Sequence, residues 1–310
     1  MDIKQLTAVV TVAETGSVTK AAQLLHLVQS AVTRQIIGLE EELGVPLFER
    51  TRQGMVPTDA GAALVERARR VLVEIERARA EIRPAHGHVT GIVHVGILGA
   101  ALDLLAQPLV EAVAEKYPGV DLRMSTAYSG HLQQWLDAGD LDLSLVYDLE
   151  STPAVHVVPL LRDQLWAVAP PEAGLRPDRP VDVAEALRQP FVMPVPGHGL
   201  RILIDQARLE ARVKPRVTVE ANSMDLQKLL VRAGCGWTVL PAPGVAADVT
   251  AGTLSAAPLR NPEIRRTVAL GLSRTGRTPP AVEAVAAELV RIIREAVREG
   301  RWPAARLIDG

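Results

Sequence analysis

The spacing of apolar residues over the first 43 positions predicts three short amphipathic helices. Apolar side chains recur every three or four residues over 2–14, 18–25 and 29–42, which is the repeat of one helix face. Gly16 is suited to end the first helix in a left-handed conformation, and Ser17 is suited to cap the second. The third helix should bury Val32, Ile36, Leu39 and Leu43.

The opposite face of the third helix is polar, and an arginine-bearing hairpin follows it. Gly44 and Pro46 break the helix, and residues 47–57 read as two extended segments with Arg50 and Arg52 near the turn between them. Any three-helix bundle could show such a polar face, with its arginine merely solvated. The hairpin favours DNA binding, because short polar side chains suit base edges in the major groove and a basic wing can follow phosphates or enter the minor groove.

Residues 58–82 predict one long helix with a narrow apolar stripe and charges of both signs elsewhere. The stripe has a period of 3.5, which is the seam of a left-handed coiled coil, and consists of Leu64, Ala68, Val71, Ile75, Ala78 and Ile82. Packing on its own domain is the alternative, but so narrow a stripe favours a partner helix. Pro84 ends the helix, and His86 with His88 lacks a third ligand nearby, so a solvated hinge is expected rather than a metal site.

From Ile92 onward β-branched runs alternate with amphipathic helices. Strands are expected at 92–97, 120–126, 141–147, 155–161, 164–169, 191–195, 216–221, 237–240 and 266–272. Helices are expected at 102–116, 131–138, 182–188, 199–211, 223–233 and 281–298. The first three strands and the two helices between them (92–147) form a βαβαβ series, which predicts a parallel sheet covered by helices on both faces. We divide residues 91–300 into lobe I (91–161 and 266–300) and lobe II (162–265), so the chain crosses between them twice, and residues 301–310 form a tail.

Composition narrows the classes of protein. The net charge of −2 favours neither nucleic acid nor membrane in bulk. Residues 16–58 hold four basic and four acidic side chains, so a single copy should bind DNA weakly. The lone cysteine, Cys235, gives neither a disulfide framework nor a cysteine metal cluster and reads as a small buried residue. The absence of a signal-peptide pattern and of a long apolar run leads us to expect a cytoplasmic protein without a membrane span.

Residues 1–60 resemble the winged helix-turn-helix of the LysR-type transcriptional regulators. The resemblance rests on SVTKAAQLLHLVQSAVTRQIIGLEEELGVPLFERT at 17–51 and on PTDAG at 57–61. It implies DNA contacts by Gln29, Ser30, Ala31, Thr33, Arg34, Arg50 and Arg52. Ile37 and Gly38 stand where the family often has a basic pair, which removes one expected phosphate contact.

The same resemblance extends to the rest of the chain, most clearly at 139–148 (GDLDLSLVYD) and 233–241 (AGCGWTVLP). It implies an α/β protein whose N-terminal winged helix-turn-helix (1–58) and linker or dimerisation helix with hinge (59–90) precede a two-lobed, periplasmic-binding-protein-like effector domain (91–300). The linker helices would pair antiparallel in a homodimer, and two dimers would assemble as a tetramer. Double-stranded promoter DNA, RNA polymerase and a small effector are the implied partners, without a cofactor.

An effector site is expected where strands end and helices begin between the lobes. The candidates are Gly99, Ala100, Ala101, Tyr128, Ser129, Tyr147, Pro194, His198, Arg201 and Asn222. Free helix N–H groups with Arg201 and His198 would favour a small anion such as a carboxylate. A loop histidine without a ligand role and an arginine held in an ion pair are equally weighted alternatives. The first loop offers Gly-Ala-Ala where many family members offer Ser or Thr, which weakens the carboxylate reading.

These patterns together predict a sequence-specific, effector-controlled transcriptional regulator rather than an enzyme. The chain has no nucleophile elbow, zinc-protease or phosphate-loop motif. A transport-type solute-binding protein or a co-regulator with little DNA binding of its own is the alternative.

Overall fold

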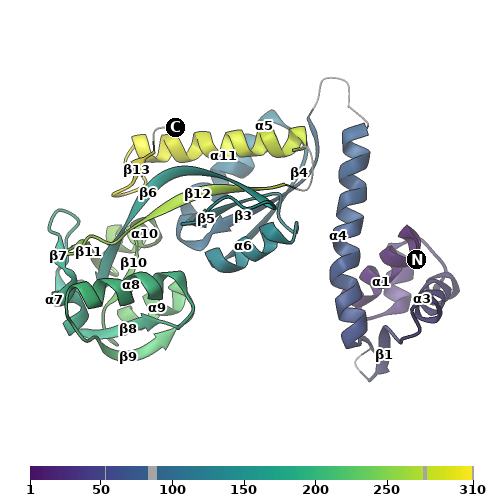
Figure 1. Ribbon diagram of the computed structural model, residues 1–310, viewed down its shortest axis with the longest axis horizontal. Helices are drawn as coiled ribbons and strands as arrows, with labels where there is room; N and C mark the ends of the chain where they lie inside the picture. Colours follow the sequence, from purple (N-terminus) through teal and green to yellow (C-terminus); the bar gives the residue numbers. More distant parts are fainter. Residues whose placement is uncertain (53, 83–88, 275–277, 309–310) are drawn as a thin grey trace. The chain divides into compact units, whose positions relative to one another are not determined.

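By its internal contacts the chain divides into two units, Met1–Pro84 and Ala85–Gly310, in the computed structural model (Figure 1). The structure describes residues 1–52, 54–82, 89–274 and 278–308, without the side chains of 76, 77 and 80–82. The hinge at Pro84, with His86 and His88, lies outside the described residues. Each unit is described by itself below.

The first unit holds the predicted three helices, hairpin and long helix. They are α1 (Ile3–Thr15), α2 (Val18–Leu24), α3 (Gln29–Leu43), β1 (Phe48–Thr51), β2 (Gly54–Pro57) and α4 (Asp59–Ile82). Gly16 ends α1 with φ 62°, and the Ser17 hydroxyl accepts a hydrogen bond from the Lys20 N–H at the start of α2. Val32, Ile36 and Leu39 are buried as expected, but Leu43 is 42% exposed because α3 ends beyond the helices that cover its inner face.

Two hydrogen bonds fix the hairpin to the helices. The Met55 N–H donates to the Gly16 carbonyl at 2.8 Å, and the Glu40 carboxylate accepts from the Leu47 N–H at 2.7 Å. Gly54 has φ 121°, and a Cβ there would lie 2.4 Å from the Gly16 carbonyl oxygen, so a side chain does not fit. The hairpin is therefore held by backbone contacts to both ends of the helical motif.

The apolar stripe on α4 has two different environments. Ala68 is 1% exposed and packs with Leu6 and Val10 of α1, while Leu64 is partly buried against the same helix cluster. Ala68 therefore offers almost no surface to a partner helix, whereas Leu64 keeps part of its surface exposed and stays a predicted seam residue. Val71 is 45% exposed, Ile75 is half-buried and Ala78 is exposed; the side chain of Ile82 lies outside the described residues.

The second unit is built on a nine-stranded sheet in the order β4-β3-β5-β12-β6-β11-β7, with β10 and β13 also paired to β6. Its strands are β3 (Thr90–Leu98), β4 (Gly119–Ala127), β5 (Leu143–Tyr147), β6 (Val155–Ala169), β7 (Val181–Asp182), β10 (Thr238–Pro241), β11 (Ser255–Arg260), β12 (Arg265–Ser273) and β13 (Arg306–Leu307). The parallel arrangement expected of the βαβαβ series is confirmed, whereas no orientation was expected for the strands that follow it. β3 is parallel to β4 and β5, but β12 is antiparallel to both β5 and β6.

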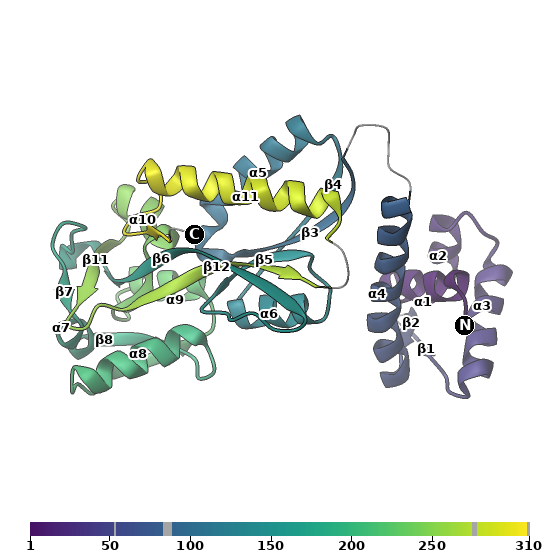
Figure 2. The same ribbon diagram turned by 45° about the horizontal axis from the view of Figure 1, so that its top comes forward.

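Helices cover both faces of the lobe I strands. α5 (Leu102–Lys116) and α11 (Pro280–Arg298) lie together on one face, and α6 (Ser129–Asp137) lies on the other (Figure 1). Figure 2 shows the same layers with β6 and β12 running out of them toward lobe II. The helices bury an aliphatic core against the sheet, which fits a chain with so few aromatic residues.

Lobe II has its own core and a small parallel sheet. The sheet pairs β8 (Pro190–Pro194) with β9 (Arg216–Ala221). The helices are α7 (Val183–Arg188), α8 (Gly199–Glu210), α9 (Met224–Arg232) and α10 (Ala246–Thr250), with 3-10 turns η2 (Pro171–Ala173) and η3 (Ala242–Val245). α10 and the strands β7, β11 and β13 were not expected from the sequence.

Two long strands join the lobes. The predicted strands 155–161 and 164–169 are one strand, β6, whose residue Leu161 belongs to the first core and Leu165 to the second. β12 runs back beside it, and the register shifts between Val268 and Ala269, opposite Pro159. Proline cannot donate a ladder hydrogen bond, so a bulge is a place where the strand tolerates it. Groups on these crossing strands lie at the junction between the lobes.

Candidate functional site

The N-terminal half of α3 presents a polar face with two aliphatic side chains at its edges. A shallow depression on this face is lined by Val28, Gln29, Ser30, Thr33, Arg34 and Ile37. Gln29, Ser30 and Arg34 are exposed, Ala31 is half-buried, and the Thr33 hydroxyl donates to the Gln29 carbonyl at 3.0 Å. The structure thus brings together on one surface all the α3 residues expected to contact DNA, except for the half-covered Ala31.

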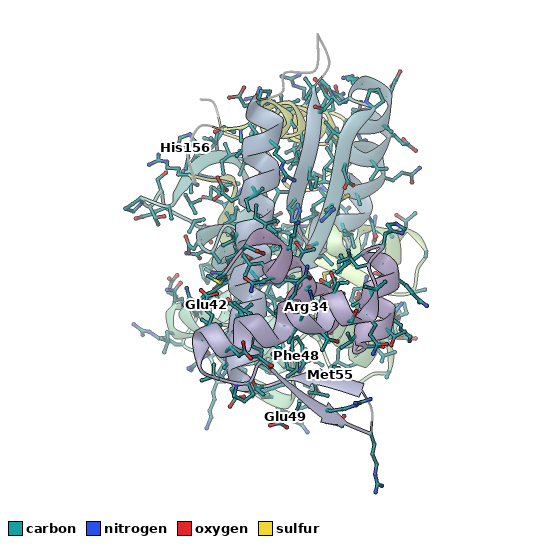
Figure 3. The ribbon with its side chains drawn as sticks, turned by 90° about the vertical axis from the view of Figure 1, so that its right-hand side faces the viewer. Arg34, Glu42, Phe48, Glu49, Met55 and His156 are labelled. Carbon is teal, nitrogen blue, oxygen red and sulfur yellow. The ribbon has the colours of Figure 1, made fainter. Side chains whose placement is uncertain are left out.

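Three arginines on α3 and the hairpin are available to an outside anion. Arg34 on α3, Arg50 on β1 and Arg52 in the turn are exposed, and none has an ion pair within the described residues. Figure 3 shows Arg34 on α3, with Phe48, Glu49 and Met55 on the hairpin. Exposed guanidinium groups on a helix and a wing are suited to phosphate contacts that fix the register of a protein on DNA.

Two of the acidic side chains in this region are already occupied. Glu40 accepts from the backbone N–H groups of Leu47 and Phe48, and Glu42 pairs with the N-terminal amine of Met1. The balance of four bases against four acids therefore overstates the negative charge that faces a ligand. The charge that a ligand meets here therefore depends on which side chains are exposed and unpaired, rather than on the net charge of the segment.

In the second unit, an aromatic contact joins the two lobes. Tyr128, immediately before α6 of lobe I, meets His198, immediately before α8 of lobe II, with ring centroids 4.5 Å apart and an edge-to-face angle of 81°. Burial, and secondarily the charge of Asp225, raises the pKa of the Tyr128 phenol. Ser129, the next residue, accepts a hydrogen bond from the Tyr147 N–H at 2.8 Å. The structure therefore gathers Tyr128, Ser129, Tyr147 and His198 where the sequence placed the effector site.

His198 is neutral in this arrangement. Its Nδ1 accepts a hydrogen bond from the Leu200 N–H at 3.0 Å, which caps the N-terminus of α8. Burial and the nearby charge of Arg266 lower the pKa of the imidazole. An imidazole whose Nδ1 is an acceptor carries its proton on Nε2, so that nitrogen is a donor.

Arg201 is held by acceptors of its own lobe. Its guanidinium donates to Asp205 at 2.8 Å, to Glu220 at 2.8 Å and to the Pro194 carbonyl at 3.0 Å. The alternative reading, an arginine held in ion pairs, is the one that the structure bears out. Through these three acceptors Arg201 ties α8 to β8 and β9.

Arg266 at the start of β12 is the interlobe arginine that sequence reasoning missed. It is only 6% exposed, its terminal nitrogen lies 3.4 Å from the fully buried carboxylate of Asp163, and its guanidinium carbon lies 3.3 Å from the Tyr147 ring centroid. The Trp302 indole also donates to Asp163, at 3.4 Å. Burial raises the pKa of the Asp163 carboxyl, and the Arg266 charge opposes that rise.

Two buried polar atoms at this junction have no hydrogen-bond partner among the residues that the structure describes. They are the Tyr128 hydroxyl and Nε of Arg266. The Tyr128 ring contacts His198, and the Arg266 guanidinium contacts the Tyr147 ring. A buried polar group without a partner costs about 1–3 kcal/mol, so such a pair calls for an explanation.

The remaining candidates lie in the turn after β3, at Pro194, whose carbonyl accepts from Arg201, and just before α9. Gly99, Ala100 and Ala101 form the 3-10 turn η1 after β3, and a Cβ on Gly244 of η3 would lie 3.4 Å from the Ala100 Cα. Asn222 is exposed beside Ser223, whose hydroxyl caps α9. Within the described ranges no helix is long and apolar enough to cross a membrane, and no group of His, Cys, Asp or Glu side chains could hold a metal ion.

Comparison with known proteins places both units in one family. Residues 3–62 match the bacterial regulatory helix-turn-helix protein, lysR family, and residues 86–293 match the LysR substrate binding domain. The HTH-type transcriptional regulator BbuR of Bordetella bronchiseptica is 31% identical over 96% of this chain and 92% of its own. The nitrogen assimilation regulatory protein nac of Klebsiella aerogenes is 26% identical over 97% of this chain and 98% of its own.

Solved structures share the fold over nearly the whole chain. Full-length CbnR complexed with its target DNA has a TM-score of 0.70 at 22% identity, covering 96% of this chain and 100% of that one. A full-length OxyR variant from Pseudomonas aeruginosa has a TM-score of 0.68 at 23% identity, covering 95% of each chain. At such identities the likeness shows the fold alone, which is a winged helix-turn-helix followed by a two-lobed α/β domain.

Proposed function

Since the chain belongs to the LysR family of DNA-binding transcriptional regulators with an effector-binding domain, we propose that a small anion controls it from the junction between the two lobes. The anion would accept from the Tyr128 hydroxyl, from Nε of Arg266 and from Nε2 of His198. Promoter DNA would meet Gln29, Ser30, Ala31, Thr33, Arg34, Arg50 and Arg52. Action on promoter DNA places the protein in the cytoplasm.

The observation that carries the effector proposal is that the Tyr128 hydroxyl and Nε of Arg266 are both buried without a hydrogen-bond partner among the described residues. Each has lost hydration without gaining a protein acceptor, which is unfavourable. A carboxylate between them would supply both missing acceptors and pair with the Arg266 charge. Because Tyr128 and His198 belong to lobe I and lobe II, such a ligand would favour one arrangement of the lobes over another.

We place the dimer contact on the part of α4 that its own unit leaves uncovered. Val71, Ile75 and Ala78 continue the stripe beyond the contact between Ala68 and α1. Two copies paired antiparallel along this segment would present two recognition helices to two half-sites. Pairs of dimers would then bind adjacent sites, and a ligand that shifts the lobes would alter DNA bending and contact with RNA polymerase.

Selection of bound sequences from random duplex DNA, using the full-length protein, tests the function directly. We expect an inverted repeat to be enriched, and we expect some members of a panel of small mono- and dicarboxylates to change the affinity for that site. Neutral amide analogues of the same acids serve as the control. Enrichment of no sequence would contradict the DNA-binding assignment, and equal effects of acids and amides would contradict the anionic effector.

A double substitution of Val71→Asp and Ile75→Asp tests the dimer contact. Two carboxylates on the uncovered stripe should prevent pairing, because each would be desolvated in the interface. Sedimentation should show monomers, and DNA affinity should fall by about 10²–10⁴-fold as the second recognition helix is lost. Exposed Val110 on α5 provides the control as Val110→Asp, and dimers that persist in the double variant would refute this seam.

A further inference from the structure

The N-terminus of the recognition helix lacks the side-chain cap that the two preceding helices have. Asp2 and Gln5 form a reciprocal capping box on α1, and the Ser17 hydroxyl caps α2. The corresponding position before α3 is Val28, which has extended backbone angles of φ −78° and ψ 146° and makes no capping hydrogen bond. Valine ranks far below Ser, Thr, Asp and Asn at this position, so the helix forgoes a stabilising contact here.

Val28 is also unusually exposed for an aliphatic residue in a small unit. Its exposed fraction is 68%, and Ile37 on the same depression is 46% exposed. Between them lie Gln29, Ser30, Thr33 and Arg34, so the polar recognition face has an aliphatic side chain at each end. Neither of the two contributes to the helix core, and at Val28 a polar residue would stabilise the fold better.

We propose that Val28 and Ile37 read thymine through its C5-methyl group in the major groove, which rests on the DNA-binding function given above. The thymine methyl is the apolar feature among the base edges that the major groove displays, and aliphatic side chains recognise it by contact. Burying one methyl group corresponds to about fourfold in affinity, from ~0.8 kcal/mol per buried group. Specificity would thus come from apolar contacts at both edges of the face as well as from its polar centre.

Uracil substitution isolates the methyl group, because uracil pairs as thymine does and lacks only that group. The full-length protein would first be used to select a site from random duplexes, and each thymine of that site would then be replaced by uracil one at a time. We expect about a fourfold loss of affinity at one or more thymines in each half-site. Specific binding that no uracil weakens would overturn the inference and leave the DNA-binding function standing.

Three variants assign the effect to residues. Val28→Ser should lose the sensitivity to uracil at one position of the half-site, and Ile37→Asn should lose it at another. Val45→Ser is the matched control, because Val45 is 42% exposed in the same unit but does not line the depression, and it should keep the full pattern. Retention of the full pattern by both Val28→Ser and Ile37→Asn would overturn the inference.

The Val28→Ser variant carries a second readout that a merely structural residue would not give. The serine hydroxyl can accept from the N–H of Ser30 or Ala31, so hydrogen exchange in the first turn of α3 should slow while thymine discrimination falls. Loss of all specific binding by this well-capped variant would assign Val28 to docking of the helix and contradict base reading. Failure of the wild-type protein to select any site would overturn the DNA-binding function and this inference together.

Discussion

The polar face of α3 and the interlobe junction each contain an arginine, and the two arginines differ in their exposure to water. Arg34 is exposed and has no ion pair within the described residues, whereas Arg266 is 6% exposed, pairs with buried Asp163 and leaves Nε without a partner. An exposed guanidinium is hydrated and costs little while it awaits a phosphate. A buried one is costly unless it is paired, so its unmet donor is a stronger indication of a ligand.

Arg201 shows why burial alone does not mark such a site. It is partly buried beside His198, yet Asp205, Glu220 and the Pro194 carbonyl accept hydrogen bonds from its Nε and Nη1. Arg266 has a single carboxylate partner, and its other neighbour is the face of the Tyr147 ring. Arg266 differs from Arg201 in having a buried N–H group, Nε, without an acceptor.

The largest effect is expected from Arg266→Met. Removing this partner leaves Asp163 buried without its counter-charge, which should lower the free energy of unfolding by about 3–5 kcal/mol. Arg201→Gln is the control, because its carboxylate partners are partly exposed and the loss should be about 1 kcal/mol. Chemical denaturation of both variants measures the difference, and equal losses would remove the distinction between the two arginines.

Arg34→Ala should leave stability within about 0.5 kcal/mol, since the side chain is exposed and unpaired. If Arg34 contacts a base, the affinity for the selected site should fall by about 1–3 kcal/mol per subunit. If it contacts a phosphate, the affinity should fall equally for all DNA sequences, and the dependence of affinity on salt concentration should become smaller. Arg123→Ala, which removes an exposed arginine paired with Asp121 in the other unit, should change neither quantity. Undiminished affinity of Arg34→Ala at every salt concentration would exclude Arg34 from the interface.

A smaller effect is expected from the ionisation of His198. Its folded-state pKa is lowered by burial and by Arg266, so the unfolded chain takes up a proton below pH about 6.5 that the folded chain does not. The stability of the second unit should therefore be fully present above that pH and decline as the pH falls toward the folded-state value. His198→Asn retains a capping side chain and should flatten this decline in pH-dependent melting; an unchanged slope would place the titration elsewhere.

The local parts of the fold and site could be predicted from the sequence. The helix repeat, Gly16 and Ser17 placed α1 to α3 correctly, and the order of residues within α3 placed Gln29, Thr33 and Arg34 on one face. These features depend on neighbours within a few residues of each other. Tertiary contacts therefore change them little, and the sequence pattern predicts them well.

The missed features depend on contacts between distant residues. Arg266 is paired with Asp163 across the antiparallel register of β12 and β6, which no local spacing indicates. Ala68 matched a coiled-coil seam but is covered by α1, and β11 contains Pro258 in a run of small residues that does not read as a strand. The partner of Arg201 at Asp205 was visible as an i,i+4 pair, whereas the one at Glu220 required the fold.

The most direct test of a ligand between the lobes is Tyr128→Phe. The change deletes only the buried, unpartnered hydroxyl, so stability should be unchanged or slightly higher, while the carboxylate concentration needed to alter DNA binding should rise about tenfold, or ~1.4 kcal/mol. Tyr117→Phe, a half-buried tyrosine elsewhere in lobe I, should leave the response unchanged. A destabilised Tyr128→Phe protein with an unaltered carboxylate response would show that the hydroxyl serves the fold, and would contradict an anion site at this junction.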